Sequence, residues 1–97
     1  MTNPAYVIVN VNITDATQYD QYRVLSSQAM TEHGAEILAR GGAQTILEGE
    51  FHPRTVIMKF ASVDKAQAFY DSQTYIAARA LRKDASVANM VIVEGVM

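Results

Sequence analysis

The pattern of hydrophobic and polar positions predicts four β-strands in this chain. Residues 5–13 alternate most clearly, because every second side chain from Val7 to Ile13 is a β-branched apolar one. β-Branched and aromatic residues dominate strands because they pack well on a pleated surface. Further segments of this kind are predicted at residues 36–48, 55–61 and 89–94.

Helical segments lie between these strands. Asp15 immediately precedes a stretch whose apolar residues recur with a helical period, which is typical of an N-cap. Gly34 is placed to end that helix in the left-handed conformation. Ser62 is the predicted N-cap of a second helix. After a short interruption, Ser72 is the predicted N-cap of a further helical segment at residues 73–84.

The connections between these elements indicate the fold. The pair Gly41-Gly42 lies inside the predicted second strand, where glycine marks a bulge or a close backbone approach. Residues 49–54 contain Pro53 and are predicted to form a hairpin connection. The resulting order, β-α-β-β-α-β, defines a ferredoxin-like arrangement. We therefore predict an α+β fold with a four-stranded antiparallel sheet, helices on one face, and a single domain over residues 1–97.

The two faces of this sheet have different neighbours, because helices can cover only one of them. We expect the helices on the wholly apolar face, formed by Val7, Val9, Val11, Val56, Met58, Phe60, Val91 and Val93. The other face still carries Tyr6, Ile8, Ile57, Met90 and Ile92. Burying each such side chain is worth roughly 1.5–3 kcal/mol, so leaving them in water would be costly.

This uncovered face predicts a homodimer that packs sheet against sheet and forms a dimeric α/β barrel. The expected polar members of the interface are Asn10, Asn12, Lys59 and Glu94. With the faces reversed, Asn10 would instead point into a cleft between helices and sheet, where its amide could bind a ligand. The alternation of residues alone does not choose between these two arrangements.

Composition excludes several classes of function. The formal charge is −2 and no cluster of basic residues occurs, which argues against nucleic acid as a partner. The absence of cysteine removes disulfides, thiolate metal sites and a thiol nucleophile. No histidines or carboxylates have the spacing of metal ligands, so we predict no metal and no cofactor. The apolar runs are too short to span a membrane, and a cytoplasmic location is expected.

His33 is the candidate catalytic residue, because an imidazole can transfer protons near neutral pH. The structural alternative is that a cation at a helix C-terminus is stabilising by itself. Arg40 precedes the two glycines, and a guanidinium beside exposed backbone amides would suit a carboxylate or another small anion. Its structural alternative is a bulge in which Arg40 pairs with Glu48 or Glu94.

Tyrosines are more numerous than a small core requires. Tyr70 and Tyr75 lie near the predicted helix break and are candidate ligand-binding residues, together with Asn10. Tyr19 and Tyr22 are expected to be structural, because amphipathic rings suit the boundary between helix and sheet.

Several segments resemble one protein family, and together they cover nearly the whole chain. They are residues 5–15, 18–23, 38–42, 47–49, 53–54 and 69–72, Tyr75, and residues 93–95. The chain resembles the uncharacterised bacterial family catalogued as domain of unknown function 1330, which is similar to the dimeric α/β-barrel superfamily. That superfamily includes cofactor-independent monooxygenases, haem-degrading enzymes, isomerases and non-catalytic proteins. The resemblance implies the fold and a dimer, and it brings no catalytic motif.

Two hypotheses for the function follow. In the first, each subunit binds a small, anionic organic molecule between helices and sheet, and cofactor-independent acid/base chemistry of the isomerase or monooxygenase kind follows there. His33 would then be the acid/base, Arg40 would hold the anion, and Asn10 with Tyr75 would orient the ligand. In the second, the protein is a non-enzymatic interaction or regulatory dimer without a ligand site.

Overall fold

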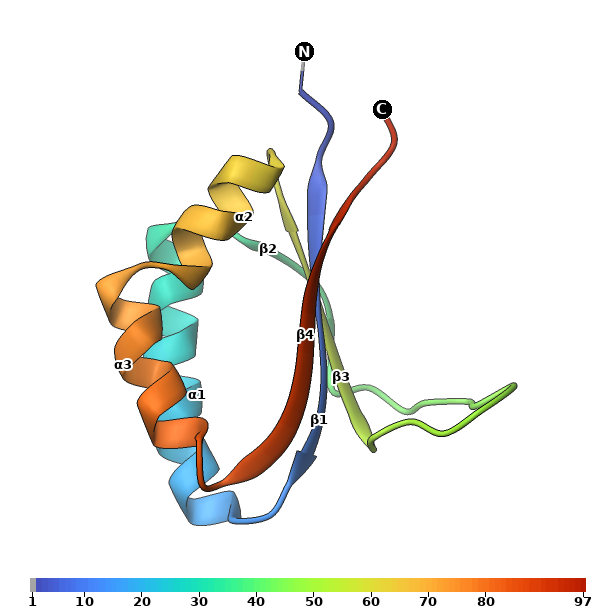
Figure 1. The fold of residues 1–97 in the computed structure, drawn as a ribbon, viewed down its shortest axis with the longest axis vertical. Coiled ribbons are helices and arrows are strands. Elements are labelled where there is room, and N and C mark those ends of the chain that lie inside the picture. The colour runs from blue at the N-terminus through green and yellow to red at the C-terminus, as the bar shows by residue number, and fades with distance from the viewer. Residues whose placement is uncertain (1) are drawn as a thin grey trace.

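The structure consists of four strands and three helices (Figure 1). The computed structural model describes residues 2–97. In chain order the elements are β1 (Ala5–Ile13), α1 (Ala16–Glu32), β2 (Glu36–Arg40), β3 (Arg54–Phe60), α2 (Val63–Tyr70), α3 (Gln73–Arg82) and β4 (Ser86–Glu94).

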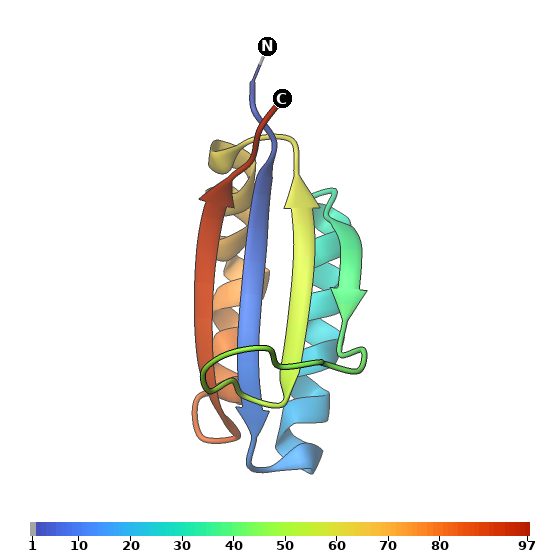
Figure 2. The ribbon, with the colours of Figure 1, turned by 90° about the vertical axis from the view of Figure 1, so that its right-hand side faces the viewer.

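The four strands form one antiparallel sheet in the order β2-β3-β1-β4 (Figure 2). β1 is central, because β3 pairs with one of its edges and β4 with the other. All three helices lie on the same face of the sheet, and the other face is left open (Figures 1 and 2). The predicted ferredoxin-like α+β fold is therefore confirmed, with the second helical region divided into α2 and α3.

The helices begin where the sequence predicts, and α3 ends at Arg82, two residues before the predicted end. The side chain of Asp15 accepts a hydrogen bond from a backbone N–H in the first turn of α1, and Ser62 and Ser72 do the same for α2 and α3. Gly34 follows α1 with φ = 68°, the left-handed conformation that glycine adopts without a steric cost. The break at Ser72 turns the chain, so that α3 packs beside α1 (Figure 1).

The core lies between the helices and one face of the sheet. Residues opposite one another in an antiparallel pair share a face, and Val7 lies between Met58 and Ile92 in the register. Val9 lies in the same way between Val56 and Met90. These strand residues pack against the apolar side of the helices.

The expected faces of the last strand are wrong. Met90 and Ile92 lie on the helix side, whereas Val91 and Val93 lie on the open side. Both sets of side chains are apolar, so alternation within β4 does not reveal its orientation; only the register against β1 fixes it. Glu94 pairs with Ala5 at the end of the helix side, so it is not a member of the open face.

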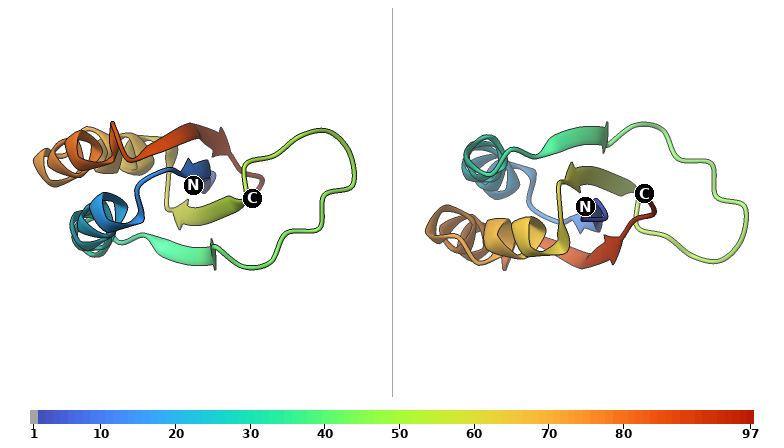
Figure 3. Two further views of the ribbon diagram at one scale, coloured as in Figure 1. Left: turned by 90° about the horizontal axis from the view of Figure 1, so that it is seen from below. Right: turned by 90° about the horizontal axis from the view of Figure 1, so that it is seen from above.

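The second strand is shorter than predicted. β2 ends at Arg40, and its irregularity lies between Ile37 and Ala39 instead of at the glycine pair. Residues 41–53 leave the sheet and form a long loop that extends away from the open face (Figures 1 and 3). Gly41 has φ = 69° and begins this departure.

The open face carries both apolar and polar side chains. Its members are Tyr6, Ile8, Asn10 and Asn12 of β1, Thr55, Ile57 and Lys59 of β3, and Val87, Asn89, Val91 and Val93 of β4. Asn10 thus lies on the open side, and the alternative that placed it in a cleft beneath the helices is excluded. Val91 is 51% exposed although it lies in the middle of its strand.

Two glycines test the role of the left-handed conformation after α1. We expect Gly34→Ala to lower the free energy of unfolding by about 1 kcal/mol, because alanine is strained at positive φ. Gly42→Ala is the matched control, since Gly42 is not at positive φ and a Cβ there meets no atom within 4 Å. Urea titration followed by circular dichroism measures both. Equal losses in the two variants would contradict this assignment.

Candidate functional site

The interior between helices and sheet is filled by aromatic rings. Tyr75 is 0% exposed, and its hydroxyl oxygen lies 2.8 Å from that of Tyr22 and 3.6 Å from the sulfur of Met90. Phe60 and Phe69 pack in the same layer, with the Phe69 ring 4.5 Å from that of Tyr75 between centroids. The predicted ligand-binding residue Tyr75 therefore lies deep in the core.

Burial raises the pKa of Tyr75 far above its usual value, and the neighbouring Tyr22 adds to the shift. Burial likewise raises the pKa of Tyr19, with Tyr22 contributing and nearby guanidinium groups opposing. These phenols are therefore neutral at physiological pH. They can donate hydrogen bonds, and they are poorly suited to accepting a proton from a substrate.

One small cavity lies at the edge of this core, between α1 and the sheet. Its volume is about 20 Å³, which is room for about one water molecule. Three arginines line it together with tyrosine, serine and apolar side chains: Arg23, Arg40 and Arg54. No acidic side chain is among the described residues that line it. The arrangement is a cationic cavity wall backed by aromatic rings.

Arg54 is held in this wall by the start of β3. It lies opposite Val11 on the helix side, and its Nε atom is buried without a hydrogen-bond partner. A Cβ at position 41 would collide with the Arg54 guanidinium, so Gly41 provides the space that this side chain occupies. The group next to Gly41 is therefore a side chain, that of Arg54, whereas the sequence predicts a bulge or a close backbone approach there.

Arg40 and Arg23 complete the wall from β2 and α1. The guanidinium of Arg40 donates a hydrogen bond of 2.7 Å to the Ser27 hydroxyl and is otherwise exposed. Arg23 lies 3.8 Å from the carboxylate of Asp20, and both side chains are well exposed, so this ion pair is weak. Among the described residues, Arg40 forms no ion pair with Glu48 or Glu94, the two partners that the structural alternative predicts.

His33 does not belong to the arginine cavity. It is the C-cap of α1, where its backbone N–H donates to the carbonyl of Ala29 at 3.1 Å. Its ring is half-buried and meets Phe69 edge to face, with 6.3 Å between centroids. That His33 acts as an acid/base stays a prediction.

Tyr70, at the end of α2, does not line the arginine cavity either. Arg79 stacks over its ring at 3.9 Å and donates a hydrogen bond of 2.8 Å to its hydroxyl. This pair joins α2 to α3, which gives the tyrosine a structural function.

Asn10 organises the long loop on the open face. Its amide nitrogen donates to the carbonyl of His52 at 3.1 Å, and its amide oxygen accepts from the His52 backbone N–H at 3.0 Å. Gln44 also donates to the His52 carbonyl and accepts a hydrogen bond from Thr55. The loop is therefore tied to β1 and β3 at its base.

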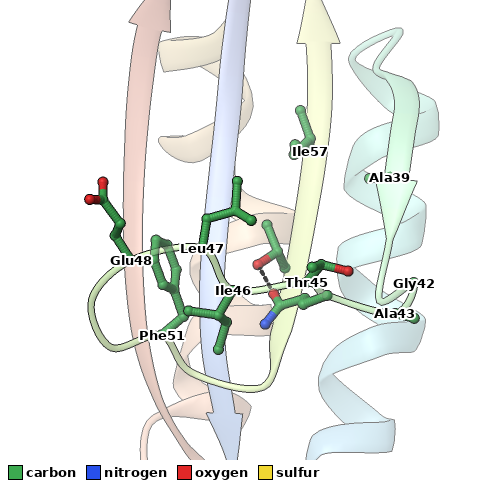
Figure 4. Close-up of a pocket in the computed structure, with 11 residues that line it drawn as sticks. Ala39, Gly42, Ala43, Thr45, Ile46, Leu47, Glu48, Phe51 and Ile57 are labelled. Atoms are coloured by element: carbon green, nitrogen blue, oxygen red, sulfur yellow. Dashed lines mark hydrogen bonds between the residues drawn. The ribbon is translucent and has the colours of Figure 1, made fainter.

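An open pocket of about 550 Å³ lies between this loop and the sheet (Figure 4). Ala39 and Ile57 contribute its sheet side, and Ile46, Leu47 and Phe51 contribute its loop side. The pocket is mostly apolar, and the Thr55–Gln44 hydrogen bond lies at its base.

The structure thus separates the predicted site residues. Arg40 lines the arginine cavity, Tyr75 is in the core, Asn10 is on the open face, and His33 and Tyr70 lie elsewhere. Sequence reasoning missed Arg54, whose only signal was its position after Pro53.

Among residues 2–97, no group of three or more histidine, cysteine or acidic side chains could hold a metal ion. No described helix combines the length and apolar character needed to cross a membrane.

The helix-covered antiparallel sheet with its β2-β3-β1-β4 order defines a ferredoxin-like protein. The chain belongs to the family described as "Domain of unknown function (DUF1330)", whose family model matches residues 4–96. The predicted family is therefore confirmed. No curated protein matches the sequence significantly.

Solved structures with the same fold come from several bacteria. The RPA0582 protein of unknown function from Rhodopseudomonas palustris aligns with a TM-score of 0.78 at 16% identity, covering 100% of this chain and 85% of that one. A dimeric ferredoxin-like protein of unknown function from Thermobifida fusca has a TM-score of 0.65 at 17% identity, covering 97% and 92%. SnoaB, a cofactor-independent oxygenase from Streptomyces nogalater, has a TM-score of 0.66 at 4% identity, covering 99% and 96%. At these identities the likeness concerns the fold alone.

The buried tyrosine pair makes a prediction about alkaline stability. The pKa of Tyr75 is raised in the folded state, so its contribution is complete below its unfolded pKa near 10 and is lost as pH rises above that value. Tyr75→Phe should be less stable than wild type by about 1 kcal/mol at about pH 8, where the hydrogen bond is missing. At about pH 11 the wild type should lose about 1.4 kcal/mol relative to Tyr75→Phe, so the difference in stability should vanish or change sign. Urea titrations at both pH values test this, and an unchanged difference would contradict it.

The loop anchor is tested by a pair of asparagines on the same face of β1. Asn10→Ala should speed hydrogen exchange of the His52 amide at least about five-fold, because it removes the oxygen that accepts this N–H. Asn12→Ala is the control, since Asn12 is exposed. Hydrogen exchange is followed by mass spectrometry. Equally slow exchange of the His52 amide in both variants would contradict the assignment.

Proposed function

We propose that the protein is a homodimer that binds a small organic anion, through its carboxylate or phosphate group, at the cavity lined by Arg23, Arg40 and Arg54. The observation that carries this proposal is that three arginines line one cavity without an acidic side chain in its lining. Guanidinium groups recognise carboxylate and phosphate through paired hydrogen bonds.

Desolvation supports the choice of an anion. The buried Nε–H of Arg54 has no partner in the described residues, and an unsatisfied buried donor costs about 1–3 kcal/mol. An anionic oxygen would satisfy such a donor and balance the charge of the wall. Because the cavity has room for about one water-sized group, it takes a single anionic oxygen, and the remainder of the ligand lies along the exposed Arg23 and Arg40 side chains.

The chemistry of the lining favours binding over proton abstraction. Tyr19 and Tyr22 line the cavity, and the pKa of Tyr19 is raised by burial, so this phenol offers a hydrogen-bond donor. His33, the predicted acid/base, is not in the lining. The oxygenase SnoaB shares the fold, so cofactor-independent chemistry is compatible with this scaffold.

The open sheet face supports the homodimer. Val91 and Val93 are about half exposed, and Ile8 and Ile57 lie beside them on the same face. Exposed apolar side chains gathered on one face are typical of an interaction site. The Thermobifida fusca protein of the same fold is dimeric. The filled interior also favours the second hypothesis, an interaction dimer that binds no ligand, and the binding experiment decides between the two.

Anion binding is tested with two variants of equal charge. We expect acetate, succinate, benzoate or inorganic phosphate at millimolar concentration to raise the melting temperature of the wild type and of Lys65→Gln, whose lysine is exposed on α2. Arg54→Gln should weaken binding of the same probe about ten-fold or more, because it removes a charged donor.

Arg40→Gln serves as the second variant, because its guanidinium is exposed and its replacement leaves the core intact. Calorimetric titration gives the affinity, and circular dichroism confirms folding. If no probe binds the wild type, or if both arginine variants bind as well as Lys65→Gln, the anion site is refuted and the interaction dimer is favoured.

A further inference from the structure

The long loop of the open face carries an exposed apolar tip. We refer to residues 43–52 as the arm. Leu47 is 88% exposed, and Phe51 is 60% exposed. Side chains of this size normally lie inside a protein or an interface, so the arm has the composition of a contact surface.

The arm is held in one conformation despite this exposure. The hydrogen bonds that join Asn10, Gln44, His52 and Thr55 fasten both of its ends to the sheet. Leu47 and Phe51 of this ordered arm remain exposed to water, so the order of the arm does not bury them within the chain. A pre-ordered contact surface instead reduces the entropy lost on binding.

The shape of the arm fits a second sheet. The arm projects outward from the open face at one end of the strands, and Leu47 and Phe51 contribute to the pocket that separates it from Ile57 (Figures 3 and 4). Packed sheets lie about 10 Å apart. A sheet seated on the open face would therefore run beside the arm and meet these side chains.

The exposed area agrees with a missing partner. The accessible surface is 6137 Å². A monomeric protein of 10.7 kDa exposes about 5,500 Å². The excess of roughly 600 Å² approaches the roughly 800 Å² that each partner buries in a standard interface.

Geometry and charge indicate how two copies meet. An arrangement that keeps the two arms at opposite ends of the dimer avoids any competition between them for the same space. An antiparallel two-fold arrangement places each arm at the opposite end of the partner sheet. That end carries Lys59, next to Tyr6 and Glu36 in the register, and no ion pair engages Lys59 in residues 2–97. The arm carries Glu48 and Glu50, so its charge is complementary to Lys59.

We propose that the arm clasps the open sheet face of a second copy of this chain, with Leu47 and Phe51 against the partner sheet and Glu48 and Glu50 facing Lys59 of that sheet. This inference rests on the homodimer of the proposed function. It adds the segment that holds the dimer and the relative direction of the two sheets.

Sedimentation velocity over a dilution series tests the apolar contact. Leu47→Asp should raise the dimer dissociation constant at least about 30-fold, because it puts a charge into an apolar interface. Val24→Asp is the matched control, since Val24 is 69% exposed on α1, away from the open face, and it should leave the constant unchanged. A wild type that is monomeric refutes the proposed homodimer itself. A wild-type dimer that Leu47→Asp leaves intact refutes the arm and preserves the homodimer.

A charge exchange tests the direction. Lys59→Glu alone, and the pair Glu48→Lys with Glu50→Lys, should each weaken the dimer, because each places like charges together. Combining all three substitutions should restore most of the affinity. Additive weakening in the combined variant would overturn the antiparallel contact.

Discussion

The burial of one face of the sheet beneath three helices is the interaction on which the rest of this structure depends. β1 lies in the middle of the sheet, and its helix-side residues are almost wholly removed from water. The helices are too few to cover both faces, so the same alternation that builds the core leaves Ile8, Ile57 and Val91 on the other side. The stable core and the apolar open face are therefore two consequences of one arrangement.

The start of β3 joins the two candidate surfaces. Residues in a strand alternate between faces, so Arg54 points to the helix side and Thr55 to the open side. Arg54 contributes to the cationic cavity, while Thr55 and His52 fasten the arm through Gln44 and Asn10. Gly41 lies in the same region. Because it has no side chain, it leaves room for the Arg54 guanidinium in its present position. A short stretch of chain thus positions both the proposed anion site and the proposed contact with a second copy.

Local signals in the sequence predict the elements well. Asp15, Ser62, Ser72 and Gly34 each act through backbone groups a few residues away, and the structure has the capping and turn geometry that those residue types favour. The order of elements then determines the fold, since few topologies satisfy it.

Features that depend on register could not be read from the sequence in the same way. The sequence predicts the wrong orientation for β4 because both of its faces are apolar. It predicts strand for residues 43–48, the first part of the arm, because they continue to mix apolar and polar side chains. The cavity arginines come from α1, β2 and β3, and only the folded chain brings them together. Asn10 and Tyr75 were expected to share a ligand, whereas the sheet separates them.

The central claim is that the open sheet face is covered by a second copy of the chain. Native mass spectrometry of the freshly purified protein over a dilution series tests it most directly, because it reports assembly and any small molecule bound to it. The account predicts a species of twice the 10.7 kDa chain mass that dissociates only on strong dilution. A single-chain mass at every concentration would contradict it.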